Sequence, residues 1–434
     1  MSEITVGVIG TVVLMFLFLI RVPVAFSMAI VGVAGFIYLS NPQAGLSILA
    51  RDIFEQFSSY SLSCIPMFIL MGCFAFASGI SKRLYNTTYA WVGHVRGGLI
   101  MATVIACAGF GAICGSSAAT AATMGKIAIP EMKKYHYDDT LATGSVASAG
   151  TLGVMIPPST VFLIYGILTE QSIGKLFIAG VLPGILLAFL MMITVAILCW
   201  RNPNLAPPGA RTSWKGRLRS LTGVIETLIL FVFVIGGLFL GWFSPTQAGG
   251  IGAGGALMIG LARRELNWRV FFEALKEALQ TSCMVIFCIT GATVFGHFMA
   301  VSRITFDLAD WVGGLPYSPN IIMGAIIFFY FLGGTFMDSM GLIVLTIPIF
   351  FPIVMRLGFD PIWFGVIVVL IAEMGVISPP EGVNVFVIKS IAPEVPLQSI
   401  FKGVLPFLAA MIVCTVIIMI FPIIATFLPS FITY

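Results

Sequence analysis

TLGVMIPPST, at residues 151–160, and EMGVISPPEG, at residues 373–382, each place a Gly-Val pair shortly before two adjacent prolines. Each stretch lies within a long apolar run. Proline lacks a backbone N–H and breaks a helix, and in lipid a backbone group without a hydrogen bond is costly. Two breaks of the same form, one in each half of the chain, therefore indicate that the interruption itself has a function.

The composition is that of an all-α polytopic membrane protein. Hydrophobic residues make up 59% of the chain, charged residues make up 9%, and the mean hydropathy is +1.08. Soluble domains carry about 25% charged residues. The net charge of +4 is small, so nucleic acid is not an expected partner. The eight cysteines form no CxxC pair and are expected to be small buried hydrophobic residues.

The sequence predicts about ten membrane spans, each of about 20 apolar residues. They lie near 3–20, 22–39, 61–80, 141–168, 174–200, 219–243, 246–262, 277–300, 361–390 and 403–428. Two further apolar regions, about 98–131 and about 319–356, contain GAICGSSAATAAT and FLGGTFMDSMG in their middle. These small and polar residues predict two re-entrant helical hairpins, whose turns are tolerated only where protein or a wet cavity covers them.

The basic residues predict the orientation. Eighteen fall on one side of the membrane, namely Arg21, Lys82, Arg83, Arg96, Lys126, Lys133, Lys134, Arg201, Arg211, Lys215, Arg217, Arg219, Arg263, Arg264, Arg269, Lys276, Lys389 and Lys402. The four on the other side are Arg51, Lys175, Arg303 and Arg356. The richer side is predicted to be cytoplasmic. Both termini are then periplasmic, and the polar linker 201–220 is cytoplasmic.

The linker divides the chain into two halves, 1–200 and 221–434, each with five crossings and one hairpin. Because five is odd, the second half must run through the membrane in the opposite sense. Shifted alignments of the halves match Gly115, Ser117, Thr120, Gly153, Pro157 and Pro158 with Gly333, Thr335, Asp338, Gly375, Pro379 and Pro380. Inverted repeats with broken helices, here about 141–168 and about 361–390, are typical of secondary transporters.

The breaks and hairpin tips predict one binding region near the middle of the membrane. Half-helix N-termini attract anions, and free carbonyl and hydroxyl oxygens bind a hard cation such as sodium. The candidate cation- and substrate-binding residues of the first repeat are Gly115, Ser116, Ser117, Thr120, Gly150, Gly153, Pro157, Pro158 and Ser159. Those of the second repeat are Gly334, Thr335, Asp338, Gly375, Pro379, Pro380 and Asn384. Sodium is the only metal expected, with no organic cofactor.

Structural interpretations compete with these assignments. Ser116, Ser117 and Thr120 would bond neighbouring carbonyls, the prolines would be plain kinks, and Asn384 would bond another helix. Asp338 would cap the helix that follows it, although a carboxylate at membrane depth is a functional candidate.

The remaining polar residues near the spans receive weaker assignments. Glu373 and Glu381 flank the second break and face either the site or water. His297 ends a span and is expected to be structural. The amphipathic segments 50–60 and 268–280 are predicted to lie along the interface as scaffold arms.

Three segments carry a resemblance to a known family: GSSAATAATMGKIAIPEM, ASAGTLGVMIPPSTVFLIYG and EMGVISPPEGVNVFVI. They resemble the large membrane subunit, the DctM family, of tripartite ATP-independent periplasmic (TRAP) transporters, over essentially the whole chain. The resemblance implies a sodium-driven importer of the bacterial inner membrane that works by an elevator motion. It also implies two partners, a small membrane subunit of about four helices and a soluble periplasmic binding protein.

Other functions stay open at this point. A stand-alone anion carrier or a sodium/proton exchanger of the same architecture is the alternative. A membrane enzyme is disfavoured because no catalytic or metal-binding cluster has the required spacing, and an ATP-driven pump because no phosphate-binding loop G-x-x-x-x-G-K-[ST] is present. The resemblance implies an organic anion as substrate and leaves open a C4-dicarboxylate, a sugar acid such as sialic acid, a keto acid or a sulfonate. No Arg or Lys is predicted at mid-membrane depth, so helix ends, hydroxyls and sodium are expected to hold it.

Overall fold

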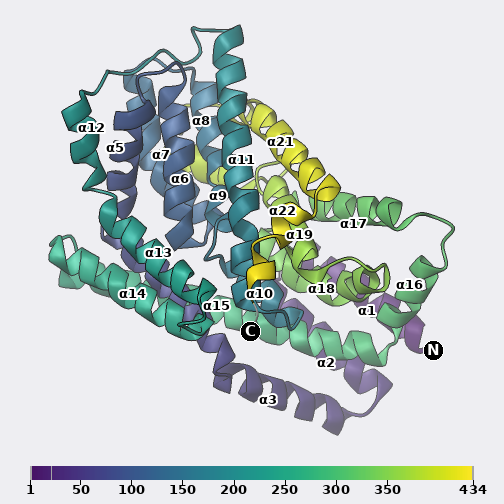
Figure 1. The fold of residues 1–434 in the computed structure, drawn as a ribbon. Helices are drawn as coiled ribbons and strands as arrows, with labels where there is room; N and C mark the ends of the chain where they lie inside the picture. The colour runs from purple at the N-terminus through teal and green to yellow at the C-terminus, as the bar shows by residue number, and fades with distance from the viewer. Residues whose placement is uncertain (1, 21, 433–434) are drawn as a thin grey trace.

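The computed structural model describes residues 2–20 and 22–432, in which every regular element is a helix (Figure 1). Arg21, one of the basic residues used for the orientation, and the chain ends at residues 1 and 433–434 lie outside the described residues. The first half contains α1 (Glu3–Leu19), α2 (Val24–Leu39), α3 (Pro42–Ser58), α4 (Cys64–Ala77), α5 (Ile80–Val92), α6 (Gly98–Cys114), α7 (Ser117–Lys134), α8 (Asp139–Ala149), α9 (Leu152–Met155), α10 (Thr160–Leu168) and α11 (Ile173–Arg201).

The second half follows an irregular linker. It contains α12 (Trp214–Leu221), α13 (Ile225–Phe239), α14 (Pro245–Ala262), α15 (Trp268–Val301), α16 (Ile304–Gly313), α17 (Pro319–Gly334), α18 (Ser339–Arg356), α19 (Pro361–Gly375), α20 (Val383–Ile391), α21 (Leu397–Ile420) and α22 (Ile423–Thr426). Short 3₁₀ turns lie at Ser61–Ser63 and Pro429–Phe431.

By length and composition, four of the described helices are able to cross a membrane: α11, α15, α18 and α21. Three bent pairs raise this number to seven if each pair is one span. The pairs are the α3 and α4 segments at 58°, the α8–α9 and α10 segments at 43°, and α12 and α13 at 44°. Helices α1, α2, α6, α17 and α19 are apolar but shorter. The all-helical class agrees with the sequence, whereas the number of about ten spans stays a prediction.

The helices form two parts. The scaffold layer comprises α1–α4 and α13–α15, in which α2 lies along α15, α4 lies along α14, and α4 contacts α15. The central bundle comprises α6–α11 and α17–α21, in which α8 packs against α21 and α17 against α19. Figure 1 shows α13, α14, α15 and α2 along the lower edge and α6–α9 and α11 rising above them.

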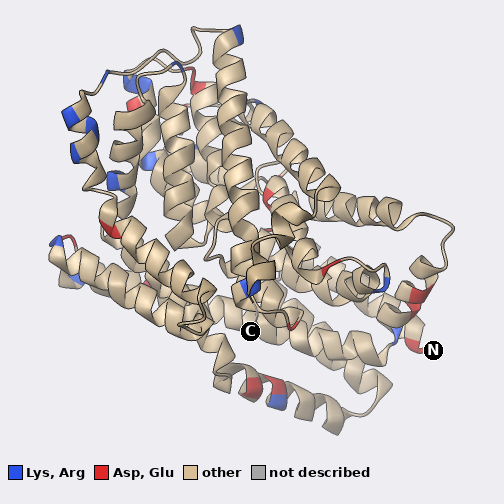
Figure 2. Ribbon diagram, viewed as in Figure 1, with Lys and Arg blue, Asp and Glu red and all other residues tan. Residues whose placement is uncertain are grey.

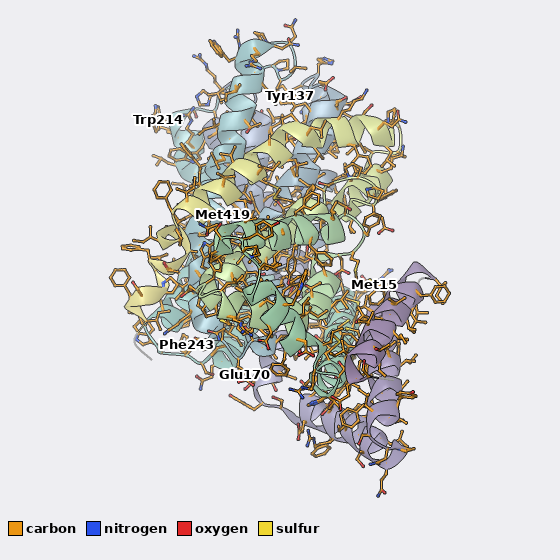
Figure 3. All side chains as sticks on the ribbon, turned by 90° about the vertical axis from the view of Figure 1, so that its right-hand side faces the viewer. Met15, Tyr137, Glu170, Trp214, Phe243 and Met419 are labelled. Carbon is orange, nitrogen blue, oxygen red and sulfur yellow. The ribbon has the colours of Figure 1, made fainter. Side chains whose placement is uncertain are left out.

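Burial in the central bundle is complete through the first Pro-Pro segment and up to the second, where Pro379, Pro380 and Glu381 are exposed. Every residue from 141 to 166 is buried, as is every residue from 362 to 378. The first of these segments runs between Tyr137 and Glu170, which lie in the upper and lower parts of Figure 3. Hydrophobic burial of this extent holds the broken helices in the interior of the bundle, where their free backbone groups need partners.

Four elements differ from the sequence-based expectation. The segments 80–92 and 304–313, almost entirely outside the predicted spans and hairpins, form the helices α5 and α16. The segment 268–280 is not a separate arm, because it continues without a bend into the span as the single helix α15. In the first half the corresponding arm α3 ends at Ser58 and turns by 58° before α4. The linker, expected to be a loop, ends in the helix α12.

Candidate functional site

Both Pro-Pro segments interrupt a helix. In the first break, between α8 and α10, Ile156 is extended, and the Ser159 side chain caps α10 by accepting from the Phe162 N–H at 3.4 Å. In the second break, between α19 and α20, Gly382 has φ +53° and begins α20. The two Pro–Pro peptide bonds are both cis. The first interruption is buried throughout, whereas Pro379, Pro380 and Glu381 of the second are exposed. Each interruption leaves a helix C-terminus and a helix N-terminus close together.

The first hairpin, α6 and α7, turns directly over the first break. Gly115 has φ +66°, a conformation that strongly favours glycine. Its carbonyl accepts a hydrogen bond from Thr160 Oγ1 at 3.0 Å. Ser116 then caps α7 by accepting from the Ala119 N–H. The tip therefore combines a helix C-terminus, a helix N-terminus and two hydroxyls in one short segment.

The second hairpin, α17 and α18, makes an equally close contact with the second break. A Cβ atom on Gly375 would lie 2.2 Å from the carbonyl carbon of Gly334, so the two backbones touch and only glycine fits. The Glu381 N–H donates to the Thr335 carbonyl at 3.2 Å. Backbone contact fixes the position of the hairpin tip on the broken helix.

Asp338 has the structural role considered from the sequence and also faces the site. Its carboxylate caps α18 by accepting from the Met340 and Gly341 N–H groups, each at 3.1 Å. It remains exposed in the cavity described below. Capping and ligand binding are compatible, because a carboxylate oxygen has more than one acceptor site.

A cavity of about 690 Å³ lies between the hairpin tips, α19 and the scaffold helices α4 and α15. Of the sequence-predicted residues, Ser116, Ser117 and Asp338 line it directly. The other predicted residues are not in its lining, although several neighbours of the breaks are, including Val154, Thr160, Val376 and Val383. Thr335 does not reach the cavity, because its hydroxyl donates to the Leu332 carbonyl at 2.7 Å.

Two predicted residues instead lie behind the cavity wall with a free oxygen. Thr120 is fully buried against Gly153, and its Oγ1 has no hydrogen-bond partner among the described residues. Asn384 is fully buried; its Nδ2 donates to the Ala147 carbonyl at 3.2 Å, and its Oδ1 has no donor in the described part of the chain. Buried polar atoms normally have a partner, so these oxygens are candidate cation ligands.

Glu373 is the main residue that the sequence reasoning undervalued. It is fully buried in α19 and lines the cavity. Ser339 Oγ donates to its Oε1 at 2.6 Å, and the Ser117 hydroxyl also interacts with this carboxylate, while its Oε2 has no donor within hydrogen-bond distance among the described residues. The available signal was a carboxylate at the end of an otherwise apolar helix. Glu381, by contrast, is exposed.

Two further charged residues line the cavity, and a histidine outside it links two helices. Lys126, assigned to the cytoplasmic side, and Glu277, from α15, also line the cavity. The lining therefore holds three carboxylates, those of Glu277, Asp338 and Glu373, and one ammonium group. His297, expected to be structural, pairs with the buried Asp52 of α3 at 3.2 Å and so links this arm to α15.

Comparison with known proteins identifies the family. The family described as tripartite ATP-independent periplasmic transporter, DctM component, matches residues 11–424. A C4-dicarboxylate TRAP transporter large permease protein from Pseudomonas aeruginosa is 37% identical over 91% of this chain and 92% of its own. A sialic acid TRAP transporter large permease protein from Vibrio cholerae is 31% identical over 94% of this chain and 95% of its own. An isethionate TRAP transporter permease protein from Oleidesulfovibrio alaskensis is 34% identical over 91% of this chain and 61% of its own.

Solved structures show the same fold at low sequence identity. The YdaH transporter of Alcanivorax borkumensis has a TM-score of 0.64 and 14% identity, with 90% of this chain and 89% of that chain covered. MtrF of Neisseria gonorrhoeae has a TM-score of 0.58 and 13% identity, covering 88% of this chain and 84% of that chain. The family match over nearly the whole chain, together with large-permease relatives above 30% identity, decides the assignment. The chain belongs to the DctM family, the large permease component of TRAP transporters, and is a transporter subunit rather than an enzyme.

Proposed function

We propose that this chain is the translocating subunit of a sodium-driven importer of a small organic anion in the bacterial inner membrane. The observation that carries the proposal is the cavity at the two hairpin tips, with hydroxyls from Ser116, Ser117 and Ser339 and carboxylates from Asp338 and Glu373 in its lining. Oxygen ligands of this kind suit a hard cation. A bound cation would offset the negative charge of the wall, which otherwise repels an anion.

The cation sites are proposed at the two breaks. The unpartnered oxygens Thr120 Oγ1, Glu373 Oε2 and Asn384 Oδ1 lie on or next to the broken helices and hairpins. The backbones of Gly153 and Gly375 pack directly against the tips of the first and second hairpins, so main-chain carbonyls of the breaks are proposed as further ligands. Helix N-termini at Ser117 and Ser339 point their partial positive charge toward the substrate region.

The inverted repeats, 1–200 and 221–434, are part of the proposal. Helix contacts support it, because contacts between a first-half helix and a second-half helix recur with the two halves interchanged. Helix α2 contacts α15 as α14 contacts α4, α7 contacts α20 as α18 contacts α10, and α8 contacts α21 as α19 contacts α11. We infer that the central bundle moves as a unit against the scaffold layer, in the manner of an elevator, and that both termini are periplasmic.

The relatives and the cavity support a proposal for the substrate class. The relatives' names specify C4-dicarboxylate, isethionate, sialic acid and ectoine. We propose a carboxylate or sulfonate of similar size, brought by a periplasmic binding protein and translocated together with a small membrane subunit. Lys126 is the cationic group in the described cavity lining, so it is the side chain placed to attract an anion.

Uptake in proteoliposomes tests the proposal. The chain, its small subunit and the cognate binding protein are reconstituted under an inward sodium gradient, and succinate, isethionate, N-acetylneuraminate and ectoine are offered in turn. Uptake of one of them that requires both partners is the expected result. Equal uptake without the binding protein would instead favour the stand-alone carrier of the same architecture, and no uptake of any acid would reject the substrate class.

A further inference from the structure

Helix α12, in the cytoplasmic linker, has three distinct faces. With about 100° between successive residues of a helix, Gly216, Arg217 and Ser220 share one face, and this face packs against α5. Thr87 Oγ1 donates to the Ser220 carbonyl at 2.7 Å. Arg217 Nη2 lies 3.3 Å from Nδ1 of His94. Contact with α5 therefore fixes the rotation of α12 and determines which side chains face outward.

The second face of α12 is apolar and largely exposed, although one edge of it, at Trp214, packs against the Trp91 ring of α5 at 6.3 Å between centroids. Trp214, Leu218 and Leu221 lie three or four residues apart and are 69%, 59% and 36% exposed. Trp214 lies at the periphery of the molecule in Figure 3. An exposed stripe of tryptophan and leucine on a helix at a membrane boundary is the pattern of an interfacial helix, whose apolar face enters the boundary between headgroups and acyl chains.

The third face, next to the apolar one, is basic. It carries Lys215 and Arg219, one turn apart and both exposed. The stretch 201–221 contains five basic residues and no acidic residue. Figure 2 shows that Lys and Arg gather at this end of the molecule, over α12, α5 and the end of α11.

Among the described residues, Lys215 and Arg219 form no ion pair. Glu226, the first acidic residue after α12, is paired with Arg263 at 2.6 Å. Nε of Arg217 and Nε1 of Trp91 have no acceptor among the described residues. Arg217 also stacks over the Trp214 ring at 5.3 Å. The region has an excess of cations and N–H donors over acceptors.

We propose that α12 is a binding site for anionic phospholipid headgroups. Trp214, Leu218 and Leu221 enter the acyl boundary, while Lys215 and Arg219 bind the phosphate groups beside them. A zwitterionic headgroup carries its own positive charge, so it binds these basic residues less strongly. Because α12 connects α11 of the central bundle to α13 of the scaffold layer, lipid bound here holds the linker at the membrane surface.

Quenching of Trp214 by brominated lipid tests the proposal. The purified chain is reconstituted in equimolar phosphatidylcholine and phosphatidylglycerol, with bromine on the acyl chains of one lipid or of the other. The difference between wild type and Trp214→Phe isolates the Trp214 signal. Brominated phosphatidylglycerol should quench it more strongly. In K215Q/R219Q this preference should disappear, since each basic residue at an anionic surface contributes about fivefold in relative binding.

A matched variant separates site binding from general charge. K134Q/K402Q removes two exposed positive charges from the same predicted side of the membrane, outside α12, and should keep the preference. Equal quenching by the two brominated lipids in the wild type overturns the proposal. A preference for brominated phosphatidylglycerol that survives in K215Q/R219Q also overturns the proposal. Absence of quenching by both lipids would show that water or another protein, rather than lipid, covers α12.

Discussion

Glu373→Gln removes one charge from the wall of the cavity while keeping the shape of the side chain. The carboxylate accepts from Ser339 Oγ at 2.6 Å through Oε1, and a glutamine carbonyl is able to accept the same bond. At the other position the substitution replaces Oε2, which has no donor, by an NH₂ group. A cation bound at Oε2 would therefore lose its ligand without a change in packing.

The size of the effect follows from electrostatics. A unit charge about 4 Å from a cation is worth about 4 kcal/mol at an effective dielectric constant of about 20. Dehydration of the cation offsets part of this, so the net loss should be about 1.4–2.8 kcal/mol, or about 10- to 100-fold in sodium affinity. We expect the half-saturating sodium concentration for uptake to rise by this factor in Glu373→Gln.

The melting temperature of the same variant, with and without sodium, provides a second test. A buried carboxylate without a cationic partner destabilises the fold, so in sodium-free buffer Glu373→Gln should melt at the same temperature as the wild type or higher. Sodium should raise the melting temperature of the wild type more than that of the variant, because a ligand stabilises the state that binds it. The control is Glu381→Gln, the same chemical change on the exposed side of the second break.

Two outcomes would refute this reasoning. If Glu373→Gln keeps both the wild-type half-saturation and the wild-type sodium-dependent melting shift, Glu373 is a structural residue held by Ser339. If Glu381→Gln shows the same change as Glu373→Gln, the effect comes from a weakened break and not from loss of the ligand at Oε2.

Three further predictions address other parts of the account. Asp338→Asn should melt as the wild type does, because Asn caps as well as Asp, whereas Asp338→Ala should lower the free energy of unfolding by about 1 kcal/mol. The half-saturating sodium concentration should rise from wild type to Asn to Ala. An unchanged value in both variants would mean that Asp338 acts only as a helix cap. Gly375→Ala should lower the free energy of unfolding by ~1–3 kcal/mol and abolish most uptake, because its Cβ would clash with the hairpin backbone. The control Gly250→Ala, at a helical position where a Cβ would meet no neighbouring atom within 4 Å, should leave stability unchanged or increase it. In a background without the native cysteines, Asn204→Cys, at an exposed position of the linker outside α12, should react with an impermeant thiol reagent only in inside-out vesicles, and Tyr317→Cys should react in intact cells. The reverse pattern would invert the orientation.

Local chemistry made part of the site predictable. A Pro-Pro pair breaks any helix, and a Gly-Ser-Ser segment ends one helix and caps the next, whatever surrounds them. Ser116, Ser117 and Asp338 could therefore be placed at hairpin tips from the sequence, and the structure puts all three in the cavity lining. Family membership was recognisable for the same reason, because these helix breakers carry the resemblance.

Tertiary packing decided the rest. Whether Glu373 faces water or the interior depends on which side of α19 the second hairpin covers, and no local pattern contains this information. Helix α5 is too polar to resemble a span and too short to stand alone, so its stability comes from packing on α6. The arm at 268–280 continues into α15, which contains no proline, whereas in the first half Pro66 lies in the first turn of α4, a position that suits a helix start and not a helix interior.

The most direct test of the central claim is whether a sodium gradient alone drives the transport. In proteoliposomes that contain the chain and its small subunit, with binding protein outside and the membrane potential clamped, only the sodium gradient is varied, and accumulation of the transported anion is measured. The account predicts accumulation above the external concentration with sodium outside, none when potassium replaces sodium, and loss of the response in Glu373→Gln at low sodium. Equal accumulation in potassium, or accumulation that follows an imposed proton gradient instead, would contradict it.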